Sequence, residues 1–365
     1  MKACGIVTEY NPFHNGHIYH IQEARKLTQC DCMIAVMSGN FVQRGEPAII
    51  DKWSRAKACL EHGVDLVLEL PYPFATQSAD QFAYGAITTL ALAQVSDIVF
   101  GSESNNLVQL QTICDELPML TKSKTESFIK NFSTLYPSCS SNDLLGISYL
   151  KALKNYPMIT PHTIKRTNGY HSKDMSSSIA SASAIRQACL KQQDLSNTTT
   201  MANDLDQPFY LEQYYPYLQT LLMNMDTNDL KEIFLMDEGM EQLLKNNAKK
   251  YFDFTTFINA CVSKRYTKSR IQRTLIQVLT QTKKTEIKQL PALHHMRVLG
   301  FNQVGRAYLS SIDLESSLLA SKFNQIPEPY RILELRAAQA YAYPLSLLER
   351  KDMIAKEWQS LVYVK

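Results

Sequence analysis

Apolar runs alternate with amphipathic stretches along the first half of the chain. The runs are uninterrupted, as in strands buried on both faces, and they span residues 2–8, 33–37, 64–70 and 97–100, with 160–166 as a fifth candidate. Helical spacing follows the first three runs, at residues 16–26, 51–61 and 78–93. This repetition of strand and helix predicts an α/β fold with a Rossmann-like parallel sheet.

The second half of the chain has a different pattern. Residues 191–207 are polar and lack periodicity, so we interpret them as a linker. Beyond Pro208 nearly all of the sequence has helical spacing and is rich in Glu, Leu, Lys and Gln. We therefore expect residues 1–190 to form the α/β domain and residues 208–365 to form a mainly α-helical domain.

The composition narrows the class of protein only slightly. With 45% hydrophobic and 20% charged residues and a net charge of +3, the chain resembles an ordinary globular protein, and any nucleic-acid surface must be local. The eight cysteines are scattered, and only Cys30 and Cys32 are close, without the further ligands of a zinc site. No signal peptide or long apolar run is evident, so we expect a cytoplasmic protein with reduced thiols and no membrane association.

The stretch from Thr8 to His17, TEYNPFHNGH, carries the first candidate chemistry. His14 and His17 flank Gly16 where the first strand passes into a helix. Two imidazole N–H groups at a helix N-terminus can bind one phosphate and stabilise the charge that develops during nucleotidyl transfer. The alternative is a loop with two surface histidines. The position directly after the first strand favours catalytic histidines that act on the α-phosphate of ATP.

A second phosphate motif is predicted at IASASAIR, Ile179 to Arg186. The hydroxyl groups of Ser181 and Ser183 could bind the outer phosphates of ATP, and Arg186 could neutralise them. We expect a helix to begin near Ser183, with Ser183 as its N-cap. The two motifs in this order resemble the H-x-G-H nucleotidyltransferase superfamily, which includes the class I aminoacyl-tRNA synthetases.

The resemblance is more specific over most of residues 1–190. TEYNPFHNGH, MSGNFVQRGEPA, VDLVLELPY, FGSE and SNDLLG together resemble the bacterial tRNA(Met) cytidine acetate ligases. That family activates acetate with ATP as acetyl-adenylate and acetylates N4 of the wobble cytidine of elongator tRNA(Met). The resemblance implies ATP contacts at Val7, Thr8, Glu9, Tyr10, Asn11, Pro12, Phe13, His14, Asn15, Gly16, His17, Ile18, Tyr19, His20, Gly101, Asn142, Arg166 and Thr167, besides Ser183 and Arg186. Mg2+ would be carried on the ATP phosphates, without protein ligands.

Some of these residues also have simpler interpretations. Gly101 ends a strand and either allows close approach of adenine or ribose or makes a simple turn. Asn142 can cap a helix that starts at Asp143 and can also contact ribose. Arg166 at a strand end is either a phosphate or base contact or a surface charge.

The polar loop GNFVQRGEP follows the second strand and is a candidate wall of the acyl site. Asn40, Gln43 and Arg44 could bind a carboxylate, a base edge or a phosphate, and Lys52 could face the same cleft. The alternative is a well-capped loop. No pattern of residues selects acetate over another small carboxylate.

A basic segment in the second half is the candidate RNA surface. Residues 254–285 contain no Asp or Glu, and Tyr266 among them could stack on a base. The alternative is an ordinary solvated helix face. The residues assigned to tRNA binding are Lys264, Arg265, Tyr266, Lys268, Arg270 and Arg273.

Two other functions remain open from the sequence. One is adenylyl transfer to a small phosphorylated metabolite, which would not need the helical extension with its basic run. The other is a non-catalytic, nucleotide-sensing RNA-binding protein that keeps the fold. We expect a tRNA partner and acetate, and no DNA.

Overall fold

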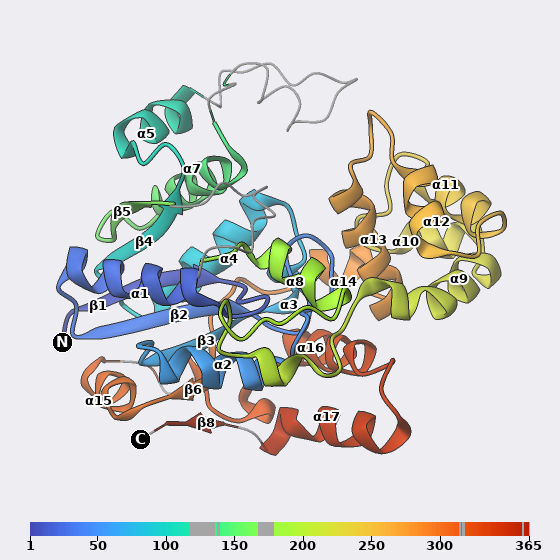
Figure 1. Ribbon diagram of the computed structural model, residues 1–365. Helices are drawn as coiled ribbons and strands as arrows, with labels where there is room; N and C mark the ends of the chain where they lie inside the picture. The colour runs from blue at the N-terminus through green and yellow to red at the C-terminus, as the bar shows by residue number, and fades with distance from the viewer. Residues whose placement is uncertain are drawn as a thin grey trace.

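A parallel sheet forms the centre of the computed structural model, which describes residues 1–116, 136, 139–166, 179–313, 315, 318–359 and 361–364 (Figure 1). The sheet has the order β5-β4-β1-β2-β3-β6-β7. Its five parallel strands are β1 (Ala3–Thr8), β2 (Cys32–Ser38), β3 (Leu66–Leu70), β4 (Asp97–Ser102) and β5 (Thr160–Lys165). The predicted Rossmann-like layout is therefore confirmed, and the carboxyl ends of these strands share one edge.

Helices cover both faces of the sheet because alternate strand residues point to opposite sides. On one face, even-numbered residues of β1 pack with α1 (Asn15–Thr28), α2 (Lys52–Glu61) and α8 (Ala182–Leu190). On the other, even-numbered residues of β2 pack with α4 (Ala79–Leu92), α5 (Leu107–Glu116) and α7 (Ser141–Leu153). The short helix α3 (Tyr72–Ala75) follows β3 directly.

A separate apolar core holds the helices that follow residue 208. Those between residues 215 and 280 lie together on the right in Figure 1. Phe257, Leu275 and Tyr341 are among its fully buried residues. The helices that build this core are α9 (Tyr215–Asn224), α10 (Thr227–Glu232), α11 (Met240–Ala248), α12 (Phe254–Cys261), α13 (Lys268–Thr280) and α16 (Glu328–Tyr341), with α14 (Lys284–Lys288) beside them.

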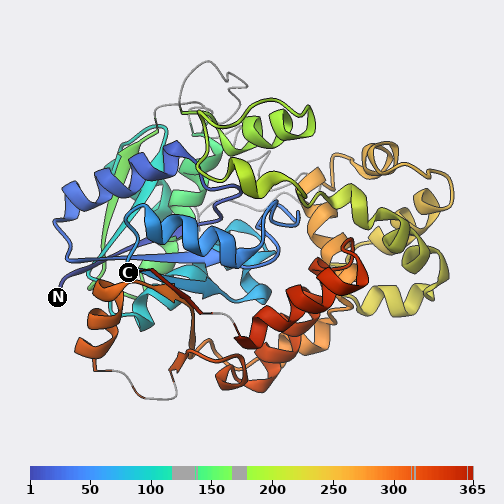
Figure 2. The same ribbon diagram turned by 60° about the horizontal axis from the view of Figure 1, so that its bottom comes forward.

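The end of the chain returns to the sheet, so the second half, expected to be mainly α-helical, also contributes strands. Strand β6 (Met296–Phe301) pairs antiparallel with β3, and β7 (Leu319–Ala320) and β8 (Val362–Tyr363) pair with β6. Between them lie α15 (Gln303–Ser311) and α17 (Leu347–Gln359). Figure 2 shows the two termini on the same side of the molecule. A short apolar run such as that of β6 cannot be told from a buried helical segment by periodicity alone.

Residues 191–207 pack on the loop after β1 rather than bridging two bodies as a free linker. The Asn15 backbone N–H donates to Thr198 O at 3.1 Å, and the Thr199 hydroxyl donates to Phe13 O. Both threonines are buried. Polarity correctly indicated a segment without regular secondary structure, apart from the 3-10 turn Ala202–Leu205. Polar groups of the 191–207 segment, however, make hydrogen bonds to backbone groups of the histidine loop.

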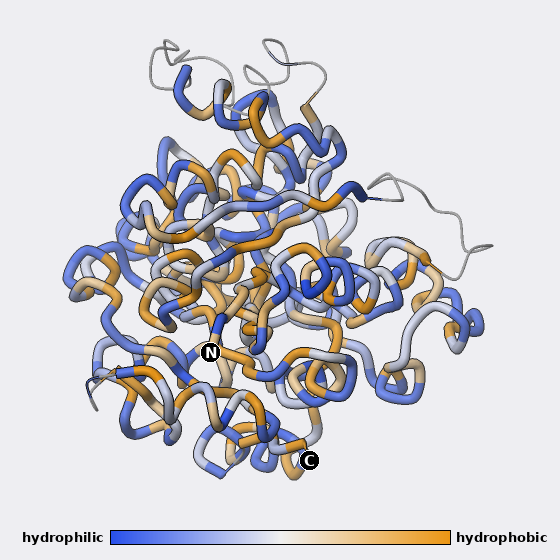
Figure 3. Tube along the Cα trace, turned by 90° about the vertical axis from the view of Figure 1, so that its left-hand side faces the viewer, coloured by the Kyte–Doolittle hydropathy of each residue, from blue (hydrophilic) through white to orange (hydrophobic). Residues whose placement is uncertain are grey.

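The distribution of apolar residues agrees with this layered arrangement. In Figure 3 the strand segments in the middle of the molecule are mostly orange, whereas the outer helices alternate between orange and blue. This alternation is typical of amphipathic helices that cover an apolar sheet. In the part of the chain that the structure describes, no helix combines the length and the apolar character that a bilayer crossing needs.

Candidate active site

The two histidines of the HNGH segment cap the helix on which they lie. His14 is the N-cap of α1, and its Nδ1 accepts a hydrogen bond from the Gly16 N–H at 3.1 Å. His17 Nδ1 accepts from the His14 N–H at 3.2 Å, so the two side chains form a reciprocal capping box. Because Nδ1 is the acceptor in each ring, the proton of each neutral imidazole resides on Nε2. The capping geometry thus gives two Nε2–H donors at a helix N-terminus.

Aromatic packing fixes the orientation of these rings. The His14 and His17 rings stack with centroids 3.7 Å apart, and Tyr10 meets His17 edge-on at 4.8 Å. Phe13 stacks on His17 at 5.7 Å. Tyr10 and Phe13 are fully buried, so the loop before α1 is part of the core rather than a surface turn. The alternative of two surface histidines is therefore wrong for His14, which is 7% exposed.

The environment keeps the histidines neutral. Burial, with further contributions from Arg166 and Arg186, lowers the pKa of His14 to about 3. Burial and the neighbouring His14 lower the pKa of His17 well below its ordinary value. Burial and Arg166 lower the pKa of His20 to about 4, and its Nε2 has no hydrogen-bond partner among the described residues. Neutral imidazoles near two arginines are suited to donate hydrogen bonds to an anion.

These depressed pKa values predict an acid-dependent loss of stability. Below about pH 6.5 the unfolded chain protonates its histidines while the folded chain does not, so the free energy of unfolding falls as the pH is lowered. The expected loss is about 1 kcal/mol per histidine between pH 6.5 and 5.5. Urea unfolding at both pH values should show a smaller loss for His14→Asn than for the wild type. Equal losses would contradict the burial of a neutral His14.

Residues from β4, α7 and the end of β5 gather beside this loop. A Cβ at Gly101 would lie 3.2 Å from Arg166 Cγ, so the glycine allows the arginine side chain to cross the strand end. Glu103 accepts a hydrogen bond from Asn142 Nδ2 and lies 3.8 Å from Arg166 Nε. The structure thus brings together Gly101, Asn142 and Arg166, whereas Thr167 lies outside the described residues.

The cap of α7 differs from the expected one. Ser140 accepts the Asp143 N–H and is the N-cap, so the Asn142 side chain is not used for capping. Instead it donates to Glu103, a residue that sequence reasoning did not select. The pattern of the FGSE segment does not indicate which group the Glu103 carboxylate contacts.

The second phosphate motif meets the first one. The Ile179 side chain would lie 3.3 Å from a Cβ at Gly16, and Arg186 Nη1 donates to Asn11 O at 2.8 Å. The N-cap of α8 is Ser181, which accepts the Ala184 N–H, and not Ser183 as expected. The Ser183 hydroxyl lies 3.1 Å from that of Ser181. Two residues of error at a helix boundary are usual when several serines compete for the cap.

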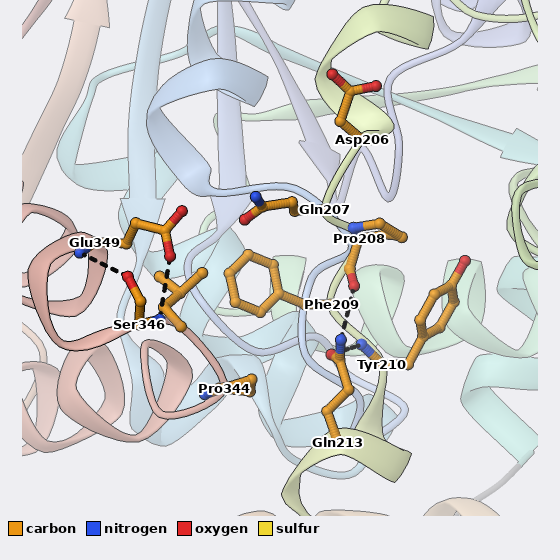
Figure 4. Close-up of a pocket in the computed structure, with 10 residues that line it drawn as sticks. Asp206, Gln207, Pro208, Phe209, Tyr210, Gln213, Pro344, Ser346 and Glu349 are labelled. Atoms are coloured by element: carbon orange, nitrogen blue, oxygen red, sulfur yellow. Dashed lines mark hydrogen bonds between the residues drawn. The ribbon is translucent and has the colours of Figure 1, made fainter.

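A cavity lined by residues 206–210, 213, 344–346 and 349 is separate from these groups. Its volume is about 320 Å³, and none of its lining residues is a predicted ATP contact (Figure 4). Asp206 and Glu349 line it without any basic residue, which disfavours a phosphate ligand. The lining consists of Asp206, Gln207, Pro208, Phe209, Tyr210, Gln213, Pro344, Leu345, Ser346 and Glu349.

Comparison with known proteins decides the family. A family model described as HIGH Nucleotidyl Transferase matches residues 1–355. The tRNA(Met) cytidine acetate ligase of Geobacillus sp. (strain WCH70) is 36% identical over 98% of this chain and 98% of its own length. The chain belongs to the tRNA(Met) cytidine acetate ligase family. The Leuconostoc citreum (strain KM20) ligase is 39% identical over 89% of this chain and 88% of its own.

Solved structures of the family share the fold. Apo Thermotoga maritima TmcAL (form I) superposes with a TM-score of 0.88 at 29% identity, covering 100% of both chains. The form II structure of the same protein, with alpha-thio ATP bound, gives a TM-score of 0.85 at 30% identity over the same coverage. A nucleotide analogue therefore binds to a protein of this fold.

The candidate acyl residues of this acetate ligase family member lie in different surroundings. The Gln43 N–H donates to Glu9 Oε1 at 2.8 Å, and its side chain donates to Gln77 O at 3.0 Å. Arg44 is half-buried, and its charge acts on Glu9, whose pKa is nevertheless raised because burial dominates. Asn40 is buried at the end of β2, and its Nδ2 has no hydrogen-bond partner among the described residues. Of the four candidates, Asn40 alone has a buried polar atom without a partner.

Lys52 does not face the cleft, which corrects the expectation for this residue. Its Nζ lies 2.7 Å from Glu69 Oε1 and 2.9 Å from Glu357 Oε1, with 1% of the side chain exposed. Arg297 completes a buried quartet, at 2.8 Å from Glu69 and 2.7 Å from Glu357. Each partner is remote in sequence, so the short polar context around Lys52 could not indicate them.

The basic segment is neutralised in part by acids that lie outside it. Glu238 pairs with Arg265 at 3.0 Å and with Arg270 at 3.8 Å. Tyr266 is buried, its hydroxyl donates to Glu238 O, and both arginines lie over its ring. Tyr266 is thus a structural residue in this conformation and is not exposed for base stacking. Lys264, Arg265 and Lys268 remain exposed on the surface.

Sequence reasoning also missed Arg55, which holds the loops of the site together. The Arg55 side chain is fully buried and donates to four backbone carbonyls. The acceptors are Glu9 O, Ser38 O, Gly39 O and Ile50 O. It thereby joins the ends of β1 and β2. An arginine inside an ordinary helical pattern gives no signal of such a role.

Proposed function

We propose that this protein activates acetate with ATP as acetyl-adenylate and transfers the acetyl group to N4 of the wobble cytidine of elongator tRNA(Met). The observation that carries this proposal is the pair of neutral, capped histidines, whose Nε2–H groups stand at the carboxyl end of the central strand beside Arg186. Ligands of open α/β sheets bind at this edge. The names of its relatives supply the acyl group and the RNA.

The first step is nucleotidyl transfer. An acetate oxygen attacks the α-phosphorus in line, a new P–O bond forms, and the bond to pyrophosphate breaks. His14 and His17 donate hydrogen bonds to the α-phosphate oxygens as charge develops. Arg186 and the start of α8 hold the departing pyrophosphate. Mg2+ would be carried on the phosphates and would neutralise part of their charge. Gly101, Asn142 and Arg166 line the side where the adenosine lies.

The second step forms an amide. The cytidine amine attacks the acetyl carbonyl, AMP leaves, and the amine proton passes to solvent. Formation of an amide from a free carboxylate is unfavourable without prior activation, which is why ATP is consumed. Exposed Lys264, Arg265 and Lys268 bind the phosphate backbone of tRNA. We expect a cytoplasmic protein that acts on tRNA and not on DNA.

Asn40 is the best placed of the acyl candidates. Its Nδ2 donor, which has no hydrogen-bond partner among the described residues, is buried just beyond the end of β2, next to the strand that leads into the histidine loop. We expect Asn40→Ala to raise the KM for acetate about tenfold, the effect of one lost hydrogen bond to a charged group, and to leave the KM for ATP unchanged. Pyrophosphate exchange at varied acetate measures this. A rise in both KM values would instead assign Asn40 to the nucleotide or to loop stability.

The decisive assay uses the whole protein with labelled acetate, ATP and purified tRNA. Label should enter tRNA only when ATP is present, and acetate should stimulate exchange of pyrophosphate into ATP. Pyrophosphate release that ignores acetate would favour the small-metabolite adenylyltransferase. The absence of exchange and of labelling would favour the non-catalytic RNA-binding protein. Label donated by acetyl-CoA instead of acetate would also refute the proposal.

A further inference from the structure

Arg273 differs from the other basic residues of its segment in its surroundings. Arg265 and Arg270 share the carboxylate of Glu238. Arg273 is half-buried, and among the described residues its side chain makes one hydrogen bond, from Nη1 to Gln43 O at 3.4 Å. No carboxylate in the described part of the chain lies within ion-pair distance of its guanidinium group. A cation is therefore partly withdrawn from water without a counter-ion.

The segment of α13 around Arg273 is joined to the loops of the active site. A Cβ at Gly45, whose φ is +76°, would lie 2.2 Å from the Arg273 backbone nitrogen, so the loop packs directly on the helix. Gln272 Nε2 donates to Glu46 Oε1 at 3.3 Å, and Glu46 lies 3.7 Å from Arg186. The Gln43 N–H of the same loop donates a hydrogen bond to the Glu9 carboxylate. Arg273 is thus held in a fixed position relative to both phosphate motifs.

The electrostatic environment of Arg273 favours an anion. Burial, together with the neighbouring charge of Arg270, lowers the pKa of Arg273 to about 10. Placing a guanidinium group in low-dielectric surroundings beside a like charge is unfavourable unless an anion compensates. The planar guanidinium group is suited to bind two oxygens of a phosphate at once.

We propose that Arg273, with Arg270 one turn before it, binds a backbone phosphate of the RNA nucleotide whose cytosine is acetylated. This inference rests on the proposed function. In the proposed function, His14, His17 and Arg186 already bind the ATP phosphates. A cytosine amine lies at the far end of its base from the backbone, so the phosphate of that nucleotide must bind beside the ATP site and not within it. Arg273 occupies such a position, across the Gln43 loop from the histidines.

The test separates the two reaction steps in Arg273→Gln. Pyrophosphate exchange reports activation. Transfer is measured in a single turnover, with protein preloaded with ATP and labelled acetate and then mixed with saturating tRNA. We expect the transfer rate to fall about ten- to a hundredfold, as for a lost charged hydrogen-bonded contact, while exchange stays within about twofold. Arg273→Lys, which keeps the charge but not the fork of donors, should give an intermediate rate.

Arg306→Gln is the matched control, because that arginine is exposed on α15 and belongs neither to the phosphate motifs nor to the basic segment. It should leave the exchange rate, the Kd for tRNA and the saturated transfer rate unchanged. An equal fall of exchange and transfer in Arg273→Gln would assign Arg273 to the ATP loops and overturn the inference. A change in the Kd for tRNA alone, or no change, would overturn it as well. A wild-type protein without acetate-dependent exchange would refute the ligase function itself, before any variant is compared.

Discussion

His14→Asn and His17→Gln are expected to lower acetate-dependent pyrophosphate exchange by about a hundred- to a thousandfold each, as when one preorganised donor to a developing anion is removed. Both replacements keep the helix start. Asparagine is a favoured N-cap, and glutamine at the third helical position can complete a capping box. What they remove is the imidazole Nε2–H. The loss of activity should therefore appear with little change in thermal stability.

The control for this pair is His294→Gln. His294 is 65% exposed and lies far along the chain from the loop, so its replacement should leave the exchange rate unaltered. The tRNA affinity of the His14 and His17 variants should also remain close to that of the wild type, since the proposed RNA surface lies on another element. If exchange persists in both variants, the charge on the α-phosphate is stabilised by other groups, such as Arg166 or Arg186.

The sheet could be predicted because its strands are buried on both faces. Uninterrupted apolar runs followed by Gly, Pro or polar residues located β1 to β5 to within a few residues. Strand β6 escaped prediction because it is short and antiparallel and lies among helices. Its place in the sheet depends on β3, more than two hundred residues away, and local periodicity does not record that partner.

The candidate site could be predicted only where its chemistry is local in sequence. His14 and His17 cap one helix and lie on either side of Gly16. A single short segment of the sequence therefore contains both histidines of the phosphate motif. Arg186 is remote from them, but its own serine-rich helix start identified it. The order of the two motifs indicated the superfamily, because each motif places phosphate-binding groups at the start of a helix.

Charged residues were harder to assign because a sequence shows charges but not their partners. Lys52 was expected in the cleft and instead meets Glu357 from the end of the chain. Tyr266 lies in a segment without acidic residues. In the fold, however, Glu238 from the connection between α10 and α11 accepts the hydrogen bond of its hydroxyl group. The same uncertainty works in the other direction for Arg273, which has no carboxylate partner in the described part of the chain, although Arg265 and Arg270 have one.

The Lys52 quartet gives the second large prediction, Lys52→Met. Removing this cation leaves two glutamates with only Arg297, in a cluster whose members are at most 5% exposed. Breaking a buried ion pair on one side costs about 3–5 kcal/mol, so the urea midpoint should fall markedly. The KM for acetate should not change, because Lys52 closes the core between α2, β3 and α17 and does not line the cleft.

The pH dependence of this variant identifies the cause of its instability. In the wild type, burial opposes ionisation of Glu357, but Lys52 and Arg297 prevail and lower its pKa, so this carboxylate stabilises the fold at neutral pH and loses that effect as the pH falls through its folded pKa. Without Lys52 one glutamate should take up a proton, and the stability deficit should narrow toward acid. Lys57→Met, at a 65% exposed position on the same helix, is the control and should alter stability by less than about 0.5 kcal/mol. A Lys52→Met protein of normal stability with a raised KM for acetate would contradict this prediction. Lys52 would then belong to the active site, and the quartet would contribute little to stability.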